Sequence, residues 1–478
     1  MTTPRIPPRT WPWLAALLAV AVYLPSLPAS FQFDDWQSVL GDERVFSLSA
    51  WWRSMPGMRA LLKLTYALNH GVCGEPCAGA DGDAAGFRAV NILIHALNTA
   101  LLYMLAQKLA QRLGRADERA ARVVGAVTAL AFALHPVQTE TVTYIAGRSG
   151  ALATLGVLAA SLAWLRGREA GAGRWWPALA ALAFVAALAG KETAAVLPLG
   201  MALCLFAEPA MPRLRDFALP LALLALEAAL LAAAWRRLPY GHLLDTSLGV
   251  RSPLDNLAAQ AQGVPWLVGQ LLDWSRLNAD PMLQPAAQWT AGTAAAAAAL
   301  AAVCVGAALS LRRHPVPAFA ILWFFLWLAP TNSLLARLDV ANDRQLYLAL
   351  AGPAWLLGHA VARLGRKAAP GTAGGVSRGE LAAMAALAAL LAAGTASRNR
   401  VYATEVSFWR DVVSKSPHNA RAWNNLGYAE ALACRPDEAR QAFEEAVRRD
   451  PGYPQPQVNL ELLEAGELPG EPGRCRDE

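Results

Sequence analysis

The stretch Phe31-Gln32-Phe33-Asp34-Asp35-Trp36 places two adjacent carboxylates directly after an apolar run that ends near Pro28. A run of that kind is typical of a membrane helix, so we expect both acids to lie where the chain leaves the bilayer. A carboxylate at such a boundary is well placed to act as a general base on a substrate dissolved in lipid. The alternative is that Asp34 and Asp35 only cap or solvate a helix end, and the stretch alone favours neither interpretation.

The composition extends this membrane interpretation to the whole chain. Of the 478 residues 55% are hydrophobic and only 16% are charged, whereas soluble domains carry roughly a quarter charged residues. The net charge of +6 is modest, and no basic run is long enough to indicate nucleic-acid binding. We therefore predict an all-α, polytopic membrane protein with about eleven transmembrane helices. The predicted spans are residues 11–28, 88–109, 121–138, 141–165, 175–189, 191–207, 216–235, 291–311, 316–331, 345–364 and 379–397.

The loop charges predict an orientation. The first apolar run has a basic flank but no clean cleavage site, so we interpret it as a retained signal anchor. With the N-terminus inside, the short loops that carry arginine fall on the cytoplasmic side, as the positive-inside rule requires. These loops are residues 110–120, 166–174, 208–215, 312–315 and 363–378. The long loops 29–87 and 236–290 and the tail from about residue 398 then lie outside, and losing one span would move the tail inside.

Charged residues from five separate segments are predicted to meet at the outer membrane face. Glu140 follows a proline-interrupted run, and irregular backbone at that depth is stable only where protein packs around it or where it lines a cavity. An ion pair between Glu140 and Arg148 is the structural explanation, and an anionic lipid headgroup held by Arg148 is the functional one. The converging residues are the acids Asp34, Asp35 and Glu140 and the bases Arg148, Lys191 and Arg344.

Other polar residues accompany this cluster. Asn91, His95 and Asn98 are spaced for one helix face, which favours hydrogen bonds between helices slightly over a catalytic role. The first outside loop carries Arg59 in an amphipathic region, and a second amphipathic stretch over residues 254–277 could cover a cavity. Cys73 and Cys77 are predicted to form a disulfide and not a metal site, since a metal site would need more ligands than His70 supplies.

The tail differs in composition from the rest of the chain. Its residues match the tetratricopeptide pattern of two helices packed through small residues. The matching residues are Trp423, Leu426, Gly427, Ala439, Phe443, Ala446 and Pro451. We predict two domains, a membrane domain over residues 1–397 with the large outside loop 29–87, and a repeat module over residues 398–478. The module serves either as a spacer or as a peptide-binding surface.

Together these motifs resemble the transmembrane-and-tetratricopeptide O-mannosyltransferases and their bacterial relatives, in the GT-C glycosyltransferase superfamily. The family's closing motif often reads Glu-Arg before Leu-Tyr, where this chain has Asn342-Asp343-Arg344 with different spacing. The motifs that carry the resemblance, in family order, are Phe33-Asp34-Asp35, the run from Val90 to Asn98, the run from His135 to Glu140, Gly147-Arg148, Gly190-Lys191-Glu192 and the run from Arg344 to Leu348.

The resemblance implies inverting transfer of a mannose-like sugar from a polyprenyl-phosphate donor to a hydroxyl acceptor outside the membrane, and it implies that this acceptor is a protein. In that scheme Asp34 or Asp35 is the base and Glu140 positions the acceptor or a metal. Arg344, Arg148 and Lys191 bind the donor phosphate, with His95, His135, Glu192 and Arg59 as supporting residues. No cofactor is expected beyond the lipid-linked substrate, and a divalent metal is not favoured.

Two other classes of protein compete with this interpretation. A membrane-anchored scaffold for envelope assembly would use the repeats to recruit partners, but so many spans with buried charges exceed what an anchor needs. A lipid-linked sugar transporter would place its charges near the bilayer midplane between inverted repeats, which the sequence lacks. We expect a bacterial inner-membrane enzyme with a periplasmic repeat module that binds a protein or envelope acceptor.

Overall fold

The structure is a computed structural model that describes residues 7–73, 84–283, 289–368 and 376–468. Its regular elements in these ranges are all helical, which confirms the predicted fold class. The helices are α1 (Trp11–Tyr23), α2 (Leu48–Arg53), α3 (Ala60–Cys73), α4 (Ala85–Arg112), α5 (Glu118–Leu134), α6 (Thr139–Val142), α7 (Arg148–Gly167), α8 (Trp176–Gly190), α9 (Leu197–Ala207), α10 (Ala218–Trp235), α11 (Tyr240–Val250), α12 (Pro253–Gln270), α13 (Ala291–Ser310), α14 (Pro315–Leu328), α15 (Leu346–Ala349), α16 (Ala351–Ala368), α17 (Arg378–Val401), α18 (Glu405–Lys415), α19 (Ala420–Leu432), α20 (Pro436–Arg449) and α21 (Gln455–Glu464).

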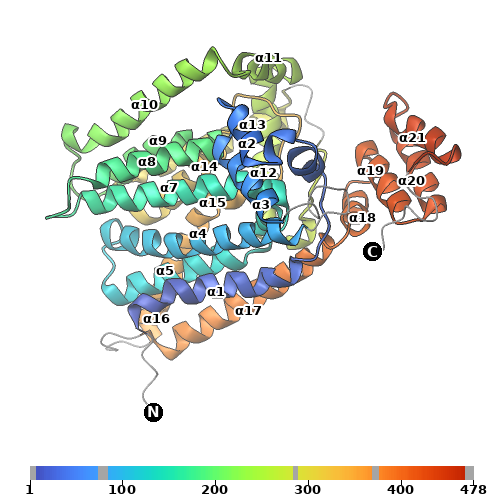
Figure 1. The fold of residues 1–478 in the computed structure, drawn as a ribbon. Coiled ribbons are helices and arrows are strands. Elements are labelled where there is room, and N and C mark those ends of the chain that lie inside the picture. Colours follow the sequence, from blue (N-terminus) through green and yellow to red (C-terminus); the bar gives the residue numbers. More distant parts are fainter. Residues whose placement is uncertain (1–6, 74–83, 284–288, 369–375, 469–478) are drawn as a thin grey trace.

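Long apolar helices run side by side and form the body of the molecule (Figure 1). By length and hydropathy, five described helices could cross a membrane, or six if the bent pair Glu118–Leu134 and Pro136–Val142 is one span. Four shorter apolar helices accompany them: Trp11–Ser26, Trp176–Gly190, Glu192–Ala207 and Pro315–Leu328. The chain is therefore a membrane protein, whereas the number of eleven spans stays a prediction.

Small residues set the spacing of the central helices. A Cβ on Gly352 of α16 would lie 2.4 Å from the Ala320 carbonyl oxygen of α14, and one on Gly358 would lie 2.8 Å from the Val124 carbonyl oxygen of α5. Backbones that approach so closely require glycine, which is how helices associate where water supplies no driving force. By contrast, only 11% of the apolar window of α10 or of α13 is buried, so these two helices present most of their surface outward.

The predicted span at residues 121–138 ends earlier than expected. Pro136 has no backbone N–H, so α5 ends at Leu134 and the chain bends by 53° into the short helices that carry Glu140. Because of the same break, α7 begins only at Arg148. This interruption places a polar turn against the protein interior at the end of the bundle.

The long segments that carry α2, α3, α11 and α12 lie at one end of the bundle, and the repeat module lies beyond that same end (Figure 1). Helix α12 does not lie free on the surface. Its Gln260 Nε2 donates to the Val340 carbonyl oxygen at 3.1 Å, and its Asn256 Nδ2 donates to the Ser333 carbonyl oxygen at 2.7 Å. The predicted amphipathic stretch at residues 254–277 thus covers the loop that leads to Arg344, and its helix ends at Gln270.

Candidate active site

The two adjacent aspartates have different surroundings. Asp35 is fully buried, and both its oxygens are occupied: Oδ2 accepts the Gln32 N–H at 3.0 Å and Oδ1 accepts the Ala146 N–H at 2.7 Å. Burial raises the pKa of Asp35 to about 7. This carboxyl group joins the turn after α1 to the turn before α7, so its contacts are structural.

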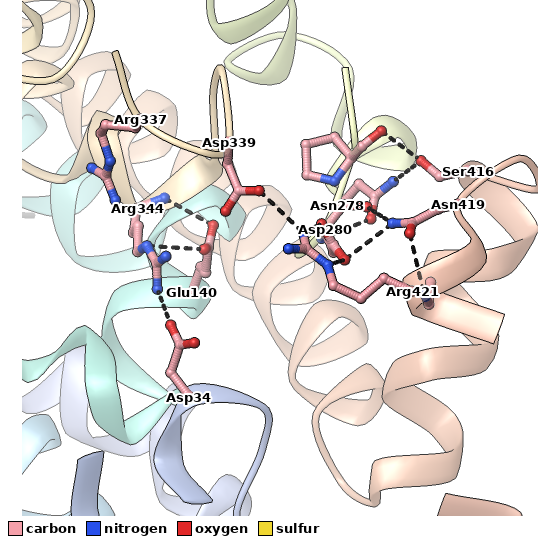
Figure 2. Close-up of polar contacts among 12 residues, drawn as sticks. Asp34, Glu140, Asn278, Asp280, Arg337, Asp339, Arg344, Ser416, Asn419 and Arg421 are labelled. Atoms are coloured by element: carbon pink, nitrogen blue, oxygen red, sulfur yellow. Dashed lines mark hydrogen bonds and ion pairs between the residues drawn. The ribbon is translucent and has the colours of Figure 1, made fainter. Parts of the chain in front are cut away.

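Asp34 is the accessible member of the pair. Its side chain is 40% exposed, and its Oδ2 lies 3.3 Å from Nη1 of Arg344. Its backbone N–H donates to the Tyr144 hydroxyl at 2.9 Å. Figure 2 shows the Asp34 carboxylate facing the Arg344 guanidinium. The structure therefore leaves Asp34, and not Asp35, able to meet a substrate.

Glu140 holds Arg344 in place. Its side chain is 4% exposed, and its Oε2 accepts the Arg344 backbone N–H at 2.9 Å while its Oε1 lies 3.6 Å from the Arg344 Nε (Figure 2). The pair joins the helical turn after Pro136 to the start of the helix at Asp343–Gln345. Arg344 is thus shared between the carboxylates of Glu140 and Asp34.

The expected contact between Glu140 and Arg148 is wrong. Arg148 is fully buried, and its guanidinium donates to neutral acceptors. These are Asn91 Oδ1 at 2.7 Å, the Phe87 carbonyl oxygen at 2.7 Å, Asn69 Oδ1 at 2.8 Å and Thr65 Oγ1 at 3.2 Å. The guanidinium also lies over the Tyr66 ring, 4.6 Å from its centre. Its donors are used inside the protein, which argues against the expected phosphate-binding role of Arg148.

Lys191 and Arg337 are cations without a protein partner. Among the residues that the structure describes, neither side chain makes a hydrogen bond or ion pair, and the two repel each other and Arg344. Lys191 was predicted as a site residue, but Arg337 was not. It lies in an irregular loop, and its one signal was a basic residue outside the membrane, seven positions before Arg344.

A small cavity lies beside Lys191 and Arg344. Lys191 and Arg344 line it together with apolar residues that include Val157 and Leu348. Trp327 and Gln345 also line it. The buried Trp327 Nε1 and Gln345 Nε2 have no acceptor among the described residues. A cavity with two cations and two unused donors suits an anion, and its apolar walls suit a hydrocarbon.

The two histidines are bound within the protein. His95 Nδ1 lies 2.8 Å from the Tyr347 hydroxyl, and its Nε2 lies 3.1 Å from the Ala133 carbonyl oxygen. His135 Nε2 lies 3.1 Å from the Leu271 carbonyl oxygen. Asn98 donates to the same Tyr347 hydroxyl at 3.1 Å. These contacts match hydrogen bonding between helices, the alternative that the spacing favoured.

Arg59 and Glu192 form an ion pair at the edge of the site. Their closest atoms are 3.0 Å apart, and their side chains are 41% and 36% exposed. An exposed pair of this kind stabilises the fold by roughly 0–1 kcal/mol. Glu192 follows Lys191 in the sequence, but in the structure its carboxylate pairs with Arg59 instead of with Lys191.

The cysteines and metal ligands add little to the site. Cys73 and Cys77, the predicted disulfide, lie outside the described side chains, whereas Cys434 of the repeat module is disulfide-bonded. Within the described ranges, no group of three or more His, Cys, Asp or Glu side chains is placed to hold a metal ion.

Two regions of the chain match known proteins. Residues 420–453 match the tetratricopeptide repeat, as predicted. The chain is 34% identical over 191 residues to the protein O-mannosyl-transferase Tmtc2 of Drosophila melanogaster, covering 37% of this chain and 19% of that protein. It is 32% identical over 176 residues to the human protein O-mannosyl-transferase TMTC1, covering 33% of this chain and 18% of that protein.

Among solved structures, the oligosaccharyltransferase of Archaeoglobus fulgidus aligns with a TM-score of 0.40 and 14% identity, covering 94% of this chain and 60% of that one. The chain spans about a fifth of the length of the curated relatives it matches. The sequence matches confirm the predicted resemblance: over about a third of its length, this chain is similar to the transmembrane-and-tetratricopeptide O-mannosyltransferases.

Proposed function

We propose that the protein is an inverting glycosyltransferase that moves a mannose-like sugar from a polyprenyl-phosphate donor to a hydroxyl group of a protein acceptor. Its similarity to proteins named O-mannosyl-transferases supports the reaction class. The observation that carries the proposal is the pairing of Asp34 with Arg344 beside a cavity. Among the described residues, two hydrogen-bond donors that line this cavity have no acceptor. That arrangement sets a base next to an anion site.

The donor phosphate binds in this cavity. Lys191, Arg337 and Arg344 supply positive charge, and among the described residues the side chains of Lys191 and Arg337 form no ion pair that the phosphate would have to break. The apolar walls accept the first part of the lipid chain. In a site sheltered from water, such fixed cations stabilise the charge that the phosphate gains as it leaves.

Asp34 is the base. Its carboxylate takes the proton of the acceptor hydroxyl while the hydroxyl oxygen forms a bond to the anomeric carbon of the sugar. The bond from that carbon to the phosphate oxygen breaks on the opposite face, and the lipid phosphate leaves with the electron pair. The configuration at the anomeric carbon therefore inverts, through an oxocarbenium-like state.

Glu140 acts through Arg344. It accepts the arginine's backbone N–H and lies beside its side chain, so it fixes the guanidinium between base and phosphate. The expected role of Glu140 at the acceptor gives way to this positioning role.

We place the reaction on the outer side of a bacterial inner membrane. The positive-inside pattern of the loops supports a cytoplasmic N-terminus and a periplasmic repeat module. The disulfide at Cys434 supports the same side for the module, because disulfides persist in oxidising compartments. The module then lies where a periplasmic protein acceptor could reach it.

The test is a transfer assay with the full chain in nanodiscs, radiolabelled polyprenyl-phosphate sugars and an envelope extract. We expect wild type to label a protein, and Asp34→Asn to lower the rate by about 10²- to 10⁴-fold. Asp42→Asn, in the same outside loop, is the matched control and keeps the wild-type rate. Adding a chelator should leave sugar transfer intact. Loss of transfer on adding the chelator would show that a divalent metal is required.

Two outcomes would overturn the proposal. One is full transfer by Asp34→Asn, which would exclude that residue as the base. The other is no transfer by wild type with any sugar donor. In that case a scaffold whose repeats recruit envelope partners becomes the better explanation, supported by the repeat match at residues 420–453.

A further inference from the structure

The loop before Arg344 connects the proposed phosphate site to the repeat module. Residues 329–342 lead from α14 to the short helix that begins at Asp343. The loop carries both Arg337 and Asp339. One side of it is held by α12, through the bond from Asn332 Nδ2 to Gln260 Oε1 at 2.9 Å. The other side meets the repeat module.

Arg421, near the start of α19, makes that second contact. Its Nη2 donates to Asp339 Oδ1 at 3.0 Å and to Asp280 Oδ1 at 2.6 Å, and its Nε donates to Asp280 Oδ2 at 3.0 Å. Asp280 is buried and also accepts from Asn419 Nδ2 at 3.0 Å. Figure 2 shows Arg421 reaching from the module to both carboxylates.

Asp339 lies within electrostatic reach of the site. Its charge attracts Arg337 and Arg344 and repels Glu140. A carboxylate that attracts two cations of the proposed phosphate site competes with the phosphate for them. Arg421 is the cation that the structure pairs with it, and the same guanidinium is fixed by Asp280 from a different loop.

We propose that Arg421 is a positioning residue for the donor site: by holding Asp339 against the repeat module, it keeps Arg337 and Arg344 open to the donor phosphate. Docking of the module and binding of the donor are thereby coupled. A change that lifts α19 from the loop releases Asp339 toward the two arginines and weakens donor binding. This inference rests on the proposed function, because it assumes that these arginines bind a lipid phosphate.

The test is a rescue experiment with the full chain in nanodiscs. Arg421→Ala should raise the KM for the polyprenyl-phosphate sugar by roughly 5- to 150-fold, the usual range for coupling between sites, with little change in kcat. Adding Asp339→Asn to Arg421→Ala should bring KM back toward wild type, because the neutral amide no longer competes. Arg410→Ala, which breaks the ion pair to Glu430 inside the module, is the matched control and should leave KM unchanged.

Rescue separates this role from a merely structural one. If Arg421 only anchored the module, Asp339→Asn would remove a second anchor and could not restore donor affinity. An unrescued double variant, or a single variant with the wild-type KM, overturns the inference.

Binding of sugar-free polyprenyl monophosphate, followed by tryptophan fluorescence, separates the two proposals. If wild type binds it with the same pattern of loss and rescue but transfers no sugar, the inference stands and the proposed function falls. If wild type transfers sugar and the pattern is absent, the inference alone falls. If wild type neither binds the phosphate nor transfers sugar, both fall.

Discussion

Replacing Arg148 with methionine tests whether its guanidinium stabilises the fold or binds the donor phosphate. This change keeps most of the apolar stem and removes the guanidinium. The resemblance assigned Arg148 to the donor phosphate, whereas the structure gives it neutral acceptors inside the protein. The two assignments predict opposite phenotypes, one in donor affinity and the other in stability.

The expected cost follows from the acceptors left behind. Asn91 and Phe87 are buried, so Asn91 Oδ1 loses its partner with no water to replace it, whereas the Phe87 carbonyl oxygen keeps the hydrogen bond of its own helix. Thr65 and Asn69 are half-buried and can turn to solvent. An unsatisfied buried group costs about 1–3 kcal/mol, so Arg148→Met should lower the free energy of unfolding by about that amount.

The assay measures stability and affinity on the same preparations. Thermal unfolding in detergent should give a clearly lower midpoint for Arg148→Met, while the KM for the donor in the folded fraction stays at the wild-type value. Lys191→Met is the matched variant, because its ammonium has no protein partner to lose. It should keep the wild-type midpoint and raise KM. An Arg148→Met protein with an unchanged midpoint and a raised KM would refute the reasoning.

Three further predictions concern other parts of the molecule. Arg337→Ala should raise the donor KM without lowering the unfolding midpoint, measured as for Lys191→Met. Because the pKa of Asp35 is raised from 3.8 to about 7, its contribution to stability is complete below the lower value and is lost as pH rises through the upper one. The free energy of unfolding of wild type should therefore fall between about pH 4 and pH 7 more steeply than that of Asp35→Asn, by about 1.4 kcal/mol per pH unit for this group, and the two should run parallel above that window, followed through the unfolding midpoint. A Cβ on Gly427 would lie 2.6 Å from the ring of Phe443, so Gly427→Ala should destabilise the repeat module by about 1–3 kcal/mol, seen as faster proteolysis of the tail.

Much of the architecture could be predicted because it depends on period and spacing. Apolar runs interrupted by basic loops identified the helices, and the spacing of Trp423, Gly427 and Phe443 identified the repeat that the family comparison confirms. The sequence also singled out Asp34, Glu140 and Arg344, which the structure brings together. The helices and the repeat could be recognised from short stretches of sequence. The site residues could be recognised because they lie in motifs that resemble those of a known family.

What could not be predicted is which way a side chain points. Asp34 and Asp35 are neighbours in an irregular turn, where no helical or strand period says which one is buried. The acceptors of Arg148 on α3 are about 80 residues away in sequence, so no short pattern links them to it. Arg337 lies in a loop without periodicity, and only its position near Arg344 in space draws attention to it.

The outward surfaces of α10 and α13 have a consequence for handling the protein. Each of these helices has only 11% of its apolar window covered by the rest of the chain, so its remaining neighbours are acyl chains of the surrounding lipid. The outward surfaces of α10 and α13 thus pack against lipid, and the length and order of the acyl chains help to determine how these two helices lie. Stability measured in a short-chain detergent therefore describes a different molecular assembly from the one in a native bilayer.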